Sequence, residues 1–175
     1  MTREPILLEA LTIQPHHLWA EQWMLLTSGD FTAGKFNTMA VGWGSFGTMW
    51  SKPFAQVVVR PNRYTHDFMM KHDTFTLCAF PEKHRKSVQL LGSKSGRNGD
   101  KIAESGLVPI VSTKIAAPGF KEAELILECR QIYRATVDPR GFLDTDIDKN
   151  YPQKDYHSIF YGEILAAFGT AAYRR

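Results

Sequence analysis

The chain has 175 residues, a length that fits one domain with its own hydrophobic core. Apolar residues make up 43% and charged residues 22% of the sequence, and only two residues are cysteines, so a disordered chain and a disulfide framework are both excluded. No apolar run reaches the roughly eighteen residues of a membrane-spanning helix, and the small net charge of +3 excludes a strongly polyionic protein.

The N-terminal segment mixes charged and apolar residues. Arg3, Glu4 and Glu9 interrupt the apolar stretch that an export signal needs. We therefore expect a cytoplasmic protein without membrane association. Cys78 and Cys129 lie within apolar runs, and we interpret them as reduced core residues.

Seven apolar runs predict a mainly β protein. They span residues 22–28, 38–43, 55–59, 74–80, 107–115, 125–137 and 158–168. Short helices are predicted over 65–71, 82–91 and 100–105, the last capped by Asp100 and ended by Gly106. Strands that outnumber short helices favour an antiparallel sheet or barrel. We expect a single domain over residues 1–175, with residues 1–20 as an N-terminal extension.

The run at 125–137 could form a helix by composition, but its period is that of a strand. One side carries Leu125, Leu127, Cys129, Tyr133 and Val137, and the other carries Glu128, Arg130 and Arg134. Such alternation predicts a half-buried antiparallel strand.

The positive charge is concentrated in one part of the chain. Residues 52–101 contain ten Lys or Arg against four Asp or Glu, whereas the remainder is net acidic. This segment is where a phosphate or another anion would bind. A solvated basic face is the alternative that charge alone leaves open.

The segment from Gly42 to Gly47 matches the dinucleotide fingerprint G-x-G-x-x-G. We reject that interpretation, because Pro53 and the strand at Ala55 leave no room for the helix that must follow the glycines. What remains is a strand that leads into a loop of small residues, whose backbone could approach a flat ligand closely.

Two arginines flank a proline turn between a predicted strand and a predicted helix. Arg60, Pro61 and Arg63 precede Thr65, which could cap the helix. Guanidinium groups beside the free amides of a helix start suit a phosphate monoester. The alternative is that both arginines pair with nearby carboxylates.

The loop from Ser93 to Lys101 is rich in hydroxyl, amide and cationic groups. It has the composition of an anion cradle, although the glycine spacing is not that of a Walker A loop. Solvated loops often share this composition.

Other polar residues give weaker signals. The six histidines show no zinc-like spacing, and we expect no metal site. His157, just before the last strand, could donate a proton or a hydrogen bond, or lie on the surface. The acidic loop at 138–155 lacks the glycine and glutamate of a calcium loop.

Taken together and in this order, these segments resemble the flavin reductase-like proteins, whose fold is an FMN-binding split β-barrel, and most closely the flavoredoxin branch. The resemblance extends from about Trp23 to Phe168. It rests on the segments 23–29, 37–43, 51–53, 57–65, 95–101 and 157–164.

The resemblance implies a six-stranded antiparallel Greek-key barrel with a few short helices, a homodimer, and one FMN in each subunit. Asn37, Thr38 and Met39 would lie along the flavin ring and ribityl chain, and Gly44, Ser45 and Phe46 would present their backbone to the ring. The residues expected to bind the phosphate are Arg60, Arg63, Thr65 and Lys101, and Ser95 is a further expected cofactor-binding residue. His157 would lie near the flavin and the nicotinamide.

The activity implied by this resemblance is hydride transfer from NADH or NADPH to the flavin, followed by electron transfer to a second flavin or a small redox protein. A flavin-bound electron carrier that does not oxidise NAD(P)H is the alternative within the same class. From a different class, a basic barrel could bind single-stranded nucleic acid through Trp43, Phe46, Trp50 and Tyr64.

Overall fold

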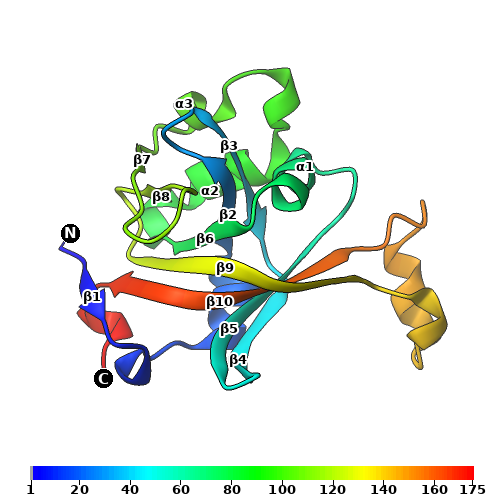
Figure 1. The fold of residues 1–175 in the computed structure, drawn as a ribbon. Helices are drawn as coiled ribbons and strands as arrows, with labels where there is room; N and C mark the ends of the chain where they lie inside the picture. The colour runs from blue at the N-terminus through cyan, green and yellow to red at the C-terminus, as the bar shows by residue number, and fades with distance from the viewer. Residues whose placement is uncertain (1) are drawn as a thin grey trace.

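The computed structural model describes residues 2–175 and is built around one antiparallel sheet (Figure 1). The sheet runs in the order β3-β2-β6-β9-β10-β5-β4, and β1 pairs with β10. Its strands are β1 (Glu4–Ile6), β2 (Met24–Asp30), β3 (Lys35–Val41), β4 (Gly44–Met49), β5 (Lys52–Val59), β6 (Thr74–Ala79), β9 (Leu125–Thr136) and β10 (Ser158–Gly169). The prediction of a mainly β, antiparallel fold is confirmed, although six strands only approximate this eight-stranded sheet.

The helices match the three predicted segments. They are α1 (Tyr64–Lys71), α2 (Arg85–Ser93) and α3 (Lys101–Ser105). Asp100 caps α3 by accepting a hydrogen bond from the Ala103 amide, and Gly106 ends it with a φ of 71°. Shorter helical turns cover Leu8–Ala10, His17–Gln22, Glu82–His84, Gly96–Asn98, Pro139–Gly141, Thr145–Asn150 and Ala171–Tyr173. Within residues 2–175, no helix combines the length and apolarity needed to cross a bilayer.

The predicted helix cap at Thr65 was wrong. Helix α1 begins one residue earlier, at Tyr64, and the Thr65 hydroxyl does not cap it. The hydroxyl instead accepts a hydrogen bond from the Asn37 amide at 2.8 Å. Thr65 is therefore buried between α1 and β3, which ties the helix start to the sheet.

Two predicted segments differ from the structure. The run 107–115 pairs for only two residues, as β7 (Pro109–Ile110) against β8 (Gly119–Phe120). The reason is that the backbone amides of Thr113 and Lys114 donate to the Glu128 carboxylate instead of to a neighbouring strand. The predicted loop at 42–47 is largely strand β4, which forms a hairpin with β5, so no dinucleotide-binding helix follows these glycines.

Strand β9 departs from the predicted alternation at both faces. Glu128 was expected outside but is 2% exposed, since it binds the segment at 113–114. Tyr133 was expected inside but is 49% exposed. The register with β10 shifts between Gln131 and Tyr133, and such a bulge reverses the faces of the residues that follow it.

The buried apolar residues form two hydrophobic clusters, one enclosed by the sheet and one packed against it. Met24, Leu26, Val57, Leu77 and Phe160 are fully buried in the cluster inside the curved sheet, which Leu18 and Trp19 also enter. A second cluster lies between the sheet and α2, where Leu25, Cys78, Leu91 and Phe120 meet. The described part of the expected extension at 1–20 contributes to the fold, because β1 pairs with β10 and the turn at 17–22 places Leu18 and Trp19 in the core.

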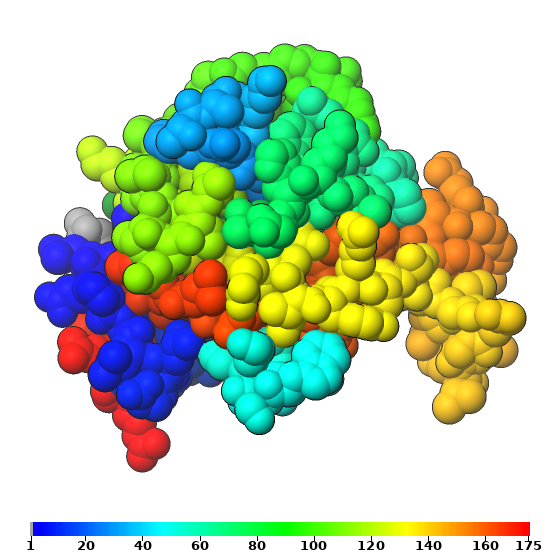
Figure 2. Space-filling model, in the orientation of Figure 1, coloured from blue at the N-terminus to red at the C-terminus, as the bar shows by residue number. Residues whose placement is uncertain are grey.

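The acidic segment at 138–155 joins β9 to β10 and stands away from the sheet (Figure 1, right). Figure 2 shows it in orange as a projecting arm, separated from the hairpin of β4 and β5 in this view. We call residues 138–156 the arm. It returns to the body of the molecule at His157, next to the end of β5.

Candidate functional site

Two adjoining cavities lie along β3. The larger, which we call the cleft, has a volume of about 600 Å³ and is lined by Trp23, Met39, Ala40, Val41, Gly42, Trp43, Val58, Arg60, Gln89, Gly92, Ser93 and His157. The smaller, which we call the cationic pocket, has about 310 Å³ and is lined by Asn37, Met39, Asn62, Arg63, Tyr64, Thr65, Ser93, Lys94, Ser95, Gly96 and Lys101. Met39 and Ser93 line both cavities, so the two spaces adjoin.

The sheet topology produces the cleft. Strands β3 and β4 are consecutive in the chain but stand at opposite ends of the sheet order. The backbone edge of β3 is therefore not covered by another strand, and the cleft forms there, with β5 and the start of β10 on its other side. A flat group that enters the cleft would contact both backbone and apolar side chains.

Helix α2 closes the cleft at close range. A Cβ atom on Gly92 would lie 2.8 Å from the Cβ of Ala40 on β3, nearer than side-chain atoms approach. Glycine at this position lets the backbone of α2 approach β3 closely. The last turn of α2 thereby reaches the boundary between the two cavities through Ser93.

Lys101 supplies a buried cation to the cationic pocket. Its side chain is 4% exposed, and Nζ donates to the carbonyl oxygens of Leu91 at 2.8 Å and Lys94 at 3.0 Å. Burial, together with the nearby positive charge of Arg63, lowers the pKa of Lys101 to about 8. An ammonium group has three N–H donors, so one remains for a ligand.

Arg63 lies on the same pocket. Its Nη2 donates to the carbonyl oxygen of Gly92, and burial, then the charge of Arg60, lowers the pKa of its guanidinium. Within residues 2–175, neither Arg63 nor Lys101 forms an ion pair. Lys101 is buried and Arg63 half-buried, and cations in such places without a carboxylate partner favour the binding of an anion.

Uncharged donors complete the cationic pocket. Asn37 and Thr65 are buried and hydrogen-bonded to each other. A Cβ on Gly96 would meet the Asn37 side-chain oxygen at 2.3 Å, so only glycine lets the loop pass so near β3. Ser95 precedes it and accepts a hydrogen bond from the Arg97 amide.

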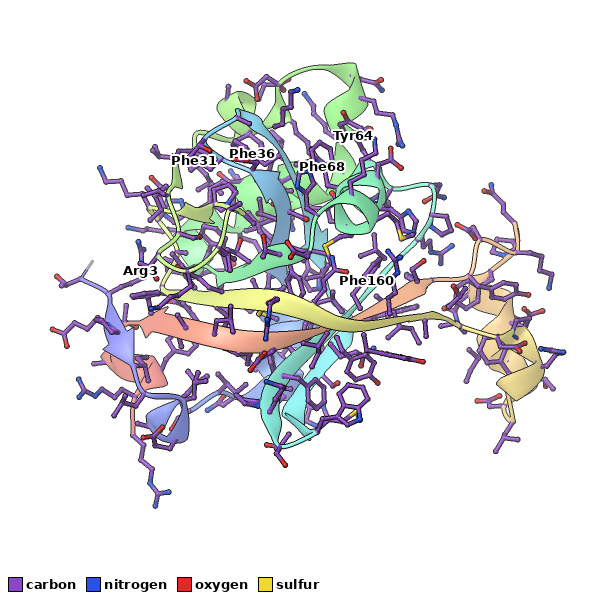
Figure 3. The ribbon with its side chains drawn as sticks, viewed as in Figure 1. Arg3, Phe31, Phe36, Tyr64, Phe68 and Phe160 are labelled. Atoms are coloured by element: carbon purple, nitrogen blue, oxygen red, sulfur yellow. The ribbon has the colours of Figure 1, made fainter. Side chains whose placement is uncertain are left out.

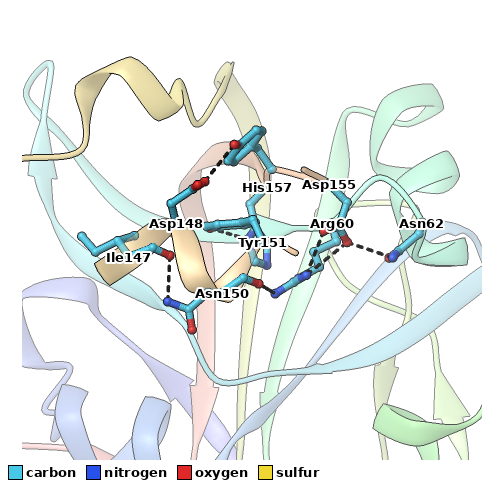
Figure 4. Close-up of polar contacts among 9 residues, drawn as sticks. Arg60, Asn62, Ile147, Asp148, Asn150, Tyr151, Asp155 and His157 are labelled. Carbon is cyan, nitrogen blue, oxygen red and sulfur yellow. Dashed lines mark hydrogen bonds and ion pairs between the residues drawn. The ribbon is translucent and has the colours of Figure 1, made fainter. Parts of the chain in front are cut away.

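Arg60 lies in the cleft and is already paired. Its Nη1 contacts both oxygens of Asp155, at 3.0 and 3.1 Å, and Nη2 donates to the Asn150 carbonyl oxygen at 2.7 Å (Figure 4). Its guanidinium also lies 5.1 Å from the centroid of the Tyr151 ring. The predicted grouping of Arg60 with Arg63 around one phosphate therefore does not match this geometry, because the arm binds Arg60.

His157 faces the cleft as a neutral imidazole. Its Nδ1 is 2.9 Å from the hydroxyl of Tyr151 on the arm, and its ring centroid lies 5.3 Å from that of Trp43. Burial, assisted by the charge of Arg60, lowers the pKa of His157 to about 4. At neutral pH it can donate or accept a hydrogen bond but does not carry a charge.

Four predicted residues line neither cavity. Thr38 is buried on the opposite face of β3, where its hydroxyl donates to the Leu26 carbonyl oxygen. Gly44, Ser45 and Phe46 lie on β4, and Phe46 stacks on Trp19 with 5.1 Å between the ring centroids. The structure therefore brings together Asn37, Met39, Arg63, Thr65, Ser95 and Lys101 in the cationic pocket, with Arg60 and His157 in the cleft.

Sequence reasoning missed several cleft residues. Gly92 and Ser93 close the cleft from α2, and Tyr151 and Asp155 orient its polar residues from the arm. The one available signal for Gly92 was a glycine directly after the predicted helix 82–91, which suggests only a helix end. Tyr151 and Asp155 gave no signal, because only the return of the arm places them there.

A family comparison identifies the chain. The model of the flavin reductase like domain matches residues 18–172. The chain belongs to this family. The resemblance inferred from the sequence segments is therefore confirmed.

Solved structures with the same fold include flavoredoxin of Desulfovibrio vulgaris, with a TM-score of 0.68 and 21% identity over 89% of this chain and 73% of the other. An FMN-binding domain of flavin reductases-like enzyme from Shewanella baltica has a TM-score of 0.69 and 18% identity. The match covers 96% of this chain and 77% of the other. The NADH:FAD oxidoreductase SgcE6 of Streptomyces globisporus has a TM-score of 0.65 and 17% identity. The match covers 88% of this chain and 78% of the other.

Among curated sequences, an uncharacterised protein of Pyrococcus abyssi is 27% identical over 133 residues. The alignment covers 74% of this family member and 64% of that relative. The chain thus spans less than two thirds of the length of this relative.

Proposed function

We propose that this family member binds a flavin phosphate and acts as an NAD(P)H-dependent flavin oxidoreductase. The observation that carries the proposal is a pair of cations, the buried Lys101 and the half-buried Arg63, beside an apolar cleft of about 600 Å³. Solved structures of the same fold, an FMN-binding domain from Shewanella baltica and the NADH:FAD oxidoreductase SgcE6, support it.

The residues present fit a flavin phosphate. The cationic pocket offers two positive charges and the side chains of Asn37, Thr65 and Ser95, which together match a dianionic monoester. The cleft offers Ala40 of β3, Gly42 just after this strand, and the Trp43 ring, which suit a planar heterocycle. The ribityl chain would then pass the shared residues Met39 and Ser93.

A bound flavin supplies the redox chemistry, namely hydride acceptance from a nicotinamide and onward electron transfer. The chain contributes orientation and hydrogen bonding. When the Tyr151 hydroxyl donates to Nδ1, the neutral His157 carries its proton on Nε2, from which it can donate in the cleft. Asp155 and the Asn150 carbonyl fix the Arg60 guanidinium at the same wall, where it would be held in place to donate a hydrogen bond to a flavin bound in the cleft.

Binding measurements test the phosphate site. We expect Arg63→Ala and Lys101→Met each to weaken FMN binding by about 10- to 100-fold, because a charge-assisted hydrogen bond is worth roughly 1.5–3 kcal/mol. Binding of riboflavin, which lacks the phosphate, should change little. Titration of apoprotein by flavin fluorescence measures both. Lys86→Met, on the exposed part of α2 and outside both cavities, is the matched control.

Anaerobic mixing tests the electron donor. Stopped-flow mixing of the FMN-loaded protein with NADH or NADPH should bleach the flavin absorbance. Protein that binds FMN tightly but is bleached by neither nucleotide would be an electron carrier, and the oxidoreductase assignment would fail. Equal FMN affinity in the Arg63 and Lys101 variants and the wild type would overturn the phosphate assignment itself.

A further inference from the structure

Trp23 forms part of the cleft wall and has a backbone conformation that residues other than glycine rarely adopt. Its φ is 60° and its ψ is 158°. It directly follows the turn at 17–22, which is wound as a π-helix, and such turns are frequent at functional sites. A residue keeps this conformation only where its surroundings hold it in place, so the contacts of Trp23 indicate what the position does.

Arg85, the first residue of α2, is the main polar group on Trp23. Its guanidinium carbon lies 4.2 Å from the centroid of the Trp23 ring, and Nη1 donates to the carbonyl oxygens of Glu21 and Gln22. The edge of the indole lies against Gly42, where an added Cβ would meet ring atoms at 3.2 and 3.3 Å. Trp23 lines the cleft and Arg85 does not, so the indole separates this cation from the cleft.

The positive charge of Arg85 is not neutralised. Within residues 2–175 its guanidinium forms no ion pair, and the carboxylate of Glu21 contacts His17 instead. Arg85 and Trp23 are both half-buried, so solvent screens this charge less than the charge of an exposed side chain. Negative charge that develops in the cleft, on the other side of the indole, would therefore be stabilised by Arg85.

The other arginines that cover an aromatic ring in the described part of the chain do have carboxylate partners. Figure 3 labels one such ring, Tyr64, at the start of α1. Arg97 covers this ring at 4.7 Å and pairs with Asp67 at 2.7 Å. The arginine over Tyr151 pairs with a carboxylate of the arm. The uncompensated charge is thus particular to the arginine behind the cleft wall.

We propose that Trp23 is a wall against which the heterocycle of the flavin packs, and that Arg85 is a positioning residue whose charge, acting through the indole, strengthens the binding of reduced flavin relative to oxidised flavin. The inference rests on the proposed function and specifies how its site treats the two redox states. A neutral flavin ring that has accepted a hydride carries one negative charge. The guanidinium therefore attracts the reduced ring more strongly than the oxidised ring.

Anaerobic titrations of the apoprotein with oxidised and with dithionite-reduced FMN test the role of Arg85. Arg85→Met keeps an unbranched side chain beside the indole. It should weaken reduced FMN by about three- to tenfold and oxidised FMN by less than about twofold, because only the reduced ring is charged. The midpoint potential of the bound flavin, which the ratio of the two affinities sets, should become more negative. Arg85→Lys, which keeps the charge, should restore most of this ratio.

Two further variants complete the test. Lys86→Met removes the same charge from the next residue of α2, at an exposed position outside the cleft lining, and should leave the ratio unchanged. Trp23→Leu should weaken both redox states of FMN about tenfold, because both lose the wall, whereas Trp23→Phe keeps a ring and should weaken them by less than about threefold.

The outcomes separate this inference from the proposed function. If the wild type binds neither form of FMN, the proposed function fails as well. If FMN binds but Arg85→Met leaves the ratio of affinities unchanged, or Lys86→Met lowers it as much, the role of the Arg85 charge is overturned and the flavin site stands. Equal weakening of both forms by Arg85→Met would show that Arg85 only supports the indole, which also overturns it. Wild-type FMN affinity in Trp23→Leu would overturn the assignment of Trp23.

Discussion

Arg63 and Lys101 are the two residues on which the proposed phosphate site depends. Four of the ten cations of the basic segment pair with a carboxylate: Lys52 with Glu163, Arg60 with Asp155, Lys94 with Glu104 and Arg97 with Asp67. An unpaired buried cation destabilises a fold. Its presence next to a cavity is therefore explained by an anionic ligand, which restores the lost interaction when it binds.

The pKa of Lys101 predicts how flavin affinity depends on pH. Lys101 loses its proton above about 8, and a phosphate monoester becomes dianionic above about 6. FMN affinity should therefore be highest between these values and fall by up to about tenfold per pH unit above pH 8. Flavin titrations of the apoprotein from pH 6 to 9.5 measure this dependence of FMN affinity on pH.

Lys101→Arg is the matched variant, because a guanidinium keeps its charge at high pH. The FMN affinity of this variant should therefore not decline at alkaline pH.

The same lysine also affects stability in the wild type. Without ligand, Lys101 has a lower pKa in the folded state than its ordinary value of 10.5, so its contribution to the free energy of unfolding rises with pH between about 8 and 10.5. An FMN affinity of wild type that stays constant to pH 9.5 would contradict the role of Lys101.

The close contact of α2 with β3 positions the site at the level of elements. Gly92 lies directly over Ala40, and its carbonyl oxygen accepts a hydrogen bond from Arg63. The helix end thus fixes both the wall of the cleft and a cation of the pocket. Loop residues 93–101 then follow from the same helix end and complete the cationic pocket.

Gly92→Ala tests this contact. Alanine favours a helix over glycine by about 1 kcal/mol, but its Cβ would meet the Cβ of Ala40 at 2.8 Å. We expect overpacking to dominate, lowering stability by roughly 1–3 kcal/mol and weakening FMN binding. Urea denaturation and flavin titration measure the two effects. The double variant Gly92→Ala with Ala40→Gly should recover binding; failure of this rescue would contradict the contact.

At the scale of the whole molecule, an exposed aromatic cluster lies at the tip of the β4–β5 hairpin. Trp50 is 57% and Tyr133 49% exposed, and their ring centroids are 5.8 Å apart. Met49 and Tyr161 adjoin them. Patches of this kind often mark protein contacts. We propose that a second copy of the chain covers this cluster, in keeping with the homodimer expected from the sequence.

The double variant Trp50→Asp with Tyr133→Asp should therefore sediment as a monomer at concentrations where the wild type sediments as a dimer, because two charges would be buried at the contact. Sedimentation velocity at several concentrations measures this. Leu143→Asp, at an isolated and fully exposed position of the arm, should leave the dimer unchanged. A monomeric wild type at every concentration would refute the proposal.

The sequence by itself determined the mainly β fold, the three helices, and the basic character of the segments around Arg63 and Lys101, because period, caps and local charge are properties of neighbouring residues. Only the tertiary structure decided which residues share a cavity. The bulge in β9, the pairing of β4 with β5 and the return of the arm to Arg60 all depend on contacts between distant segments. Strand register and buried hydrogen bonds are set by such contacts, so no local pattern encodes them.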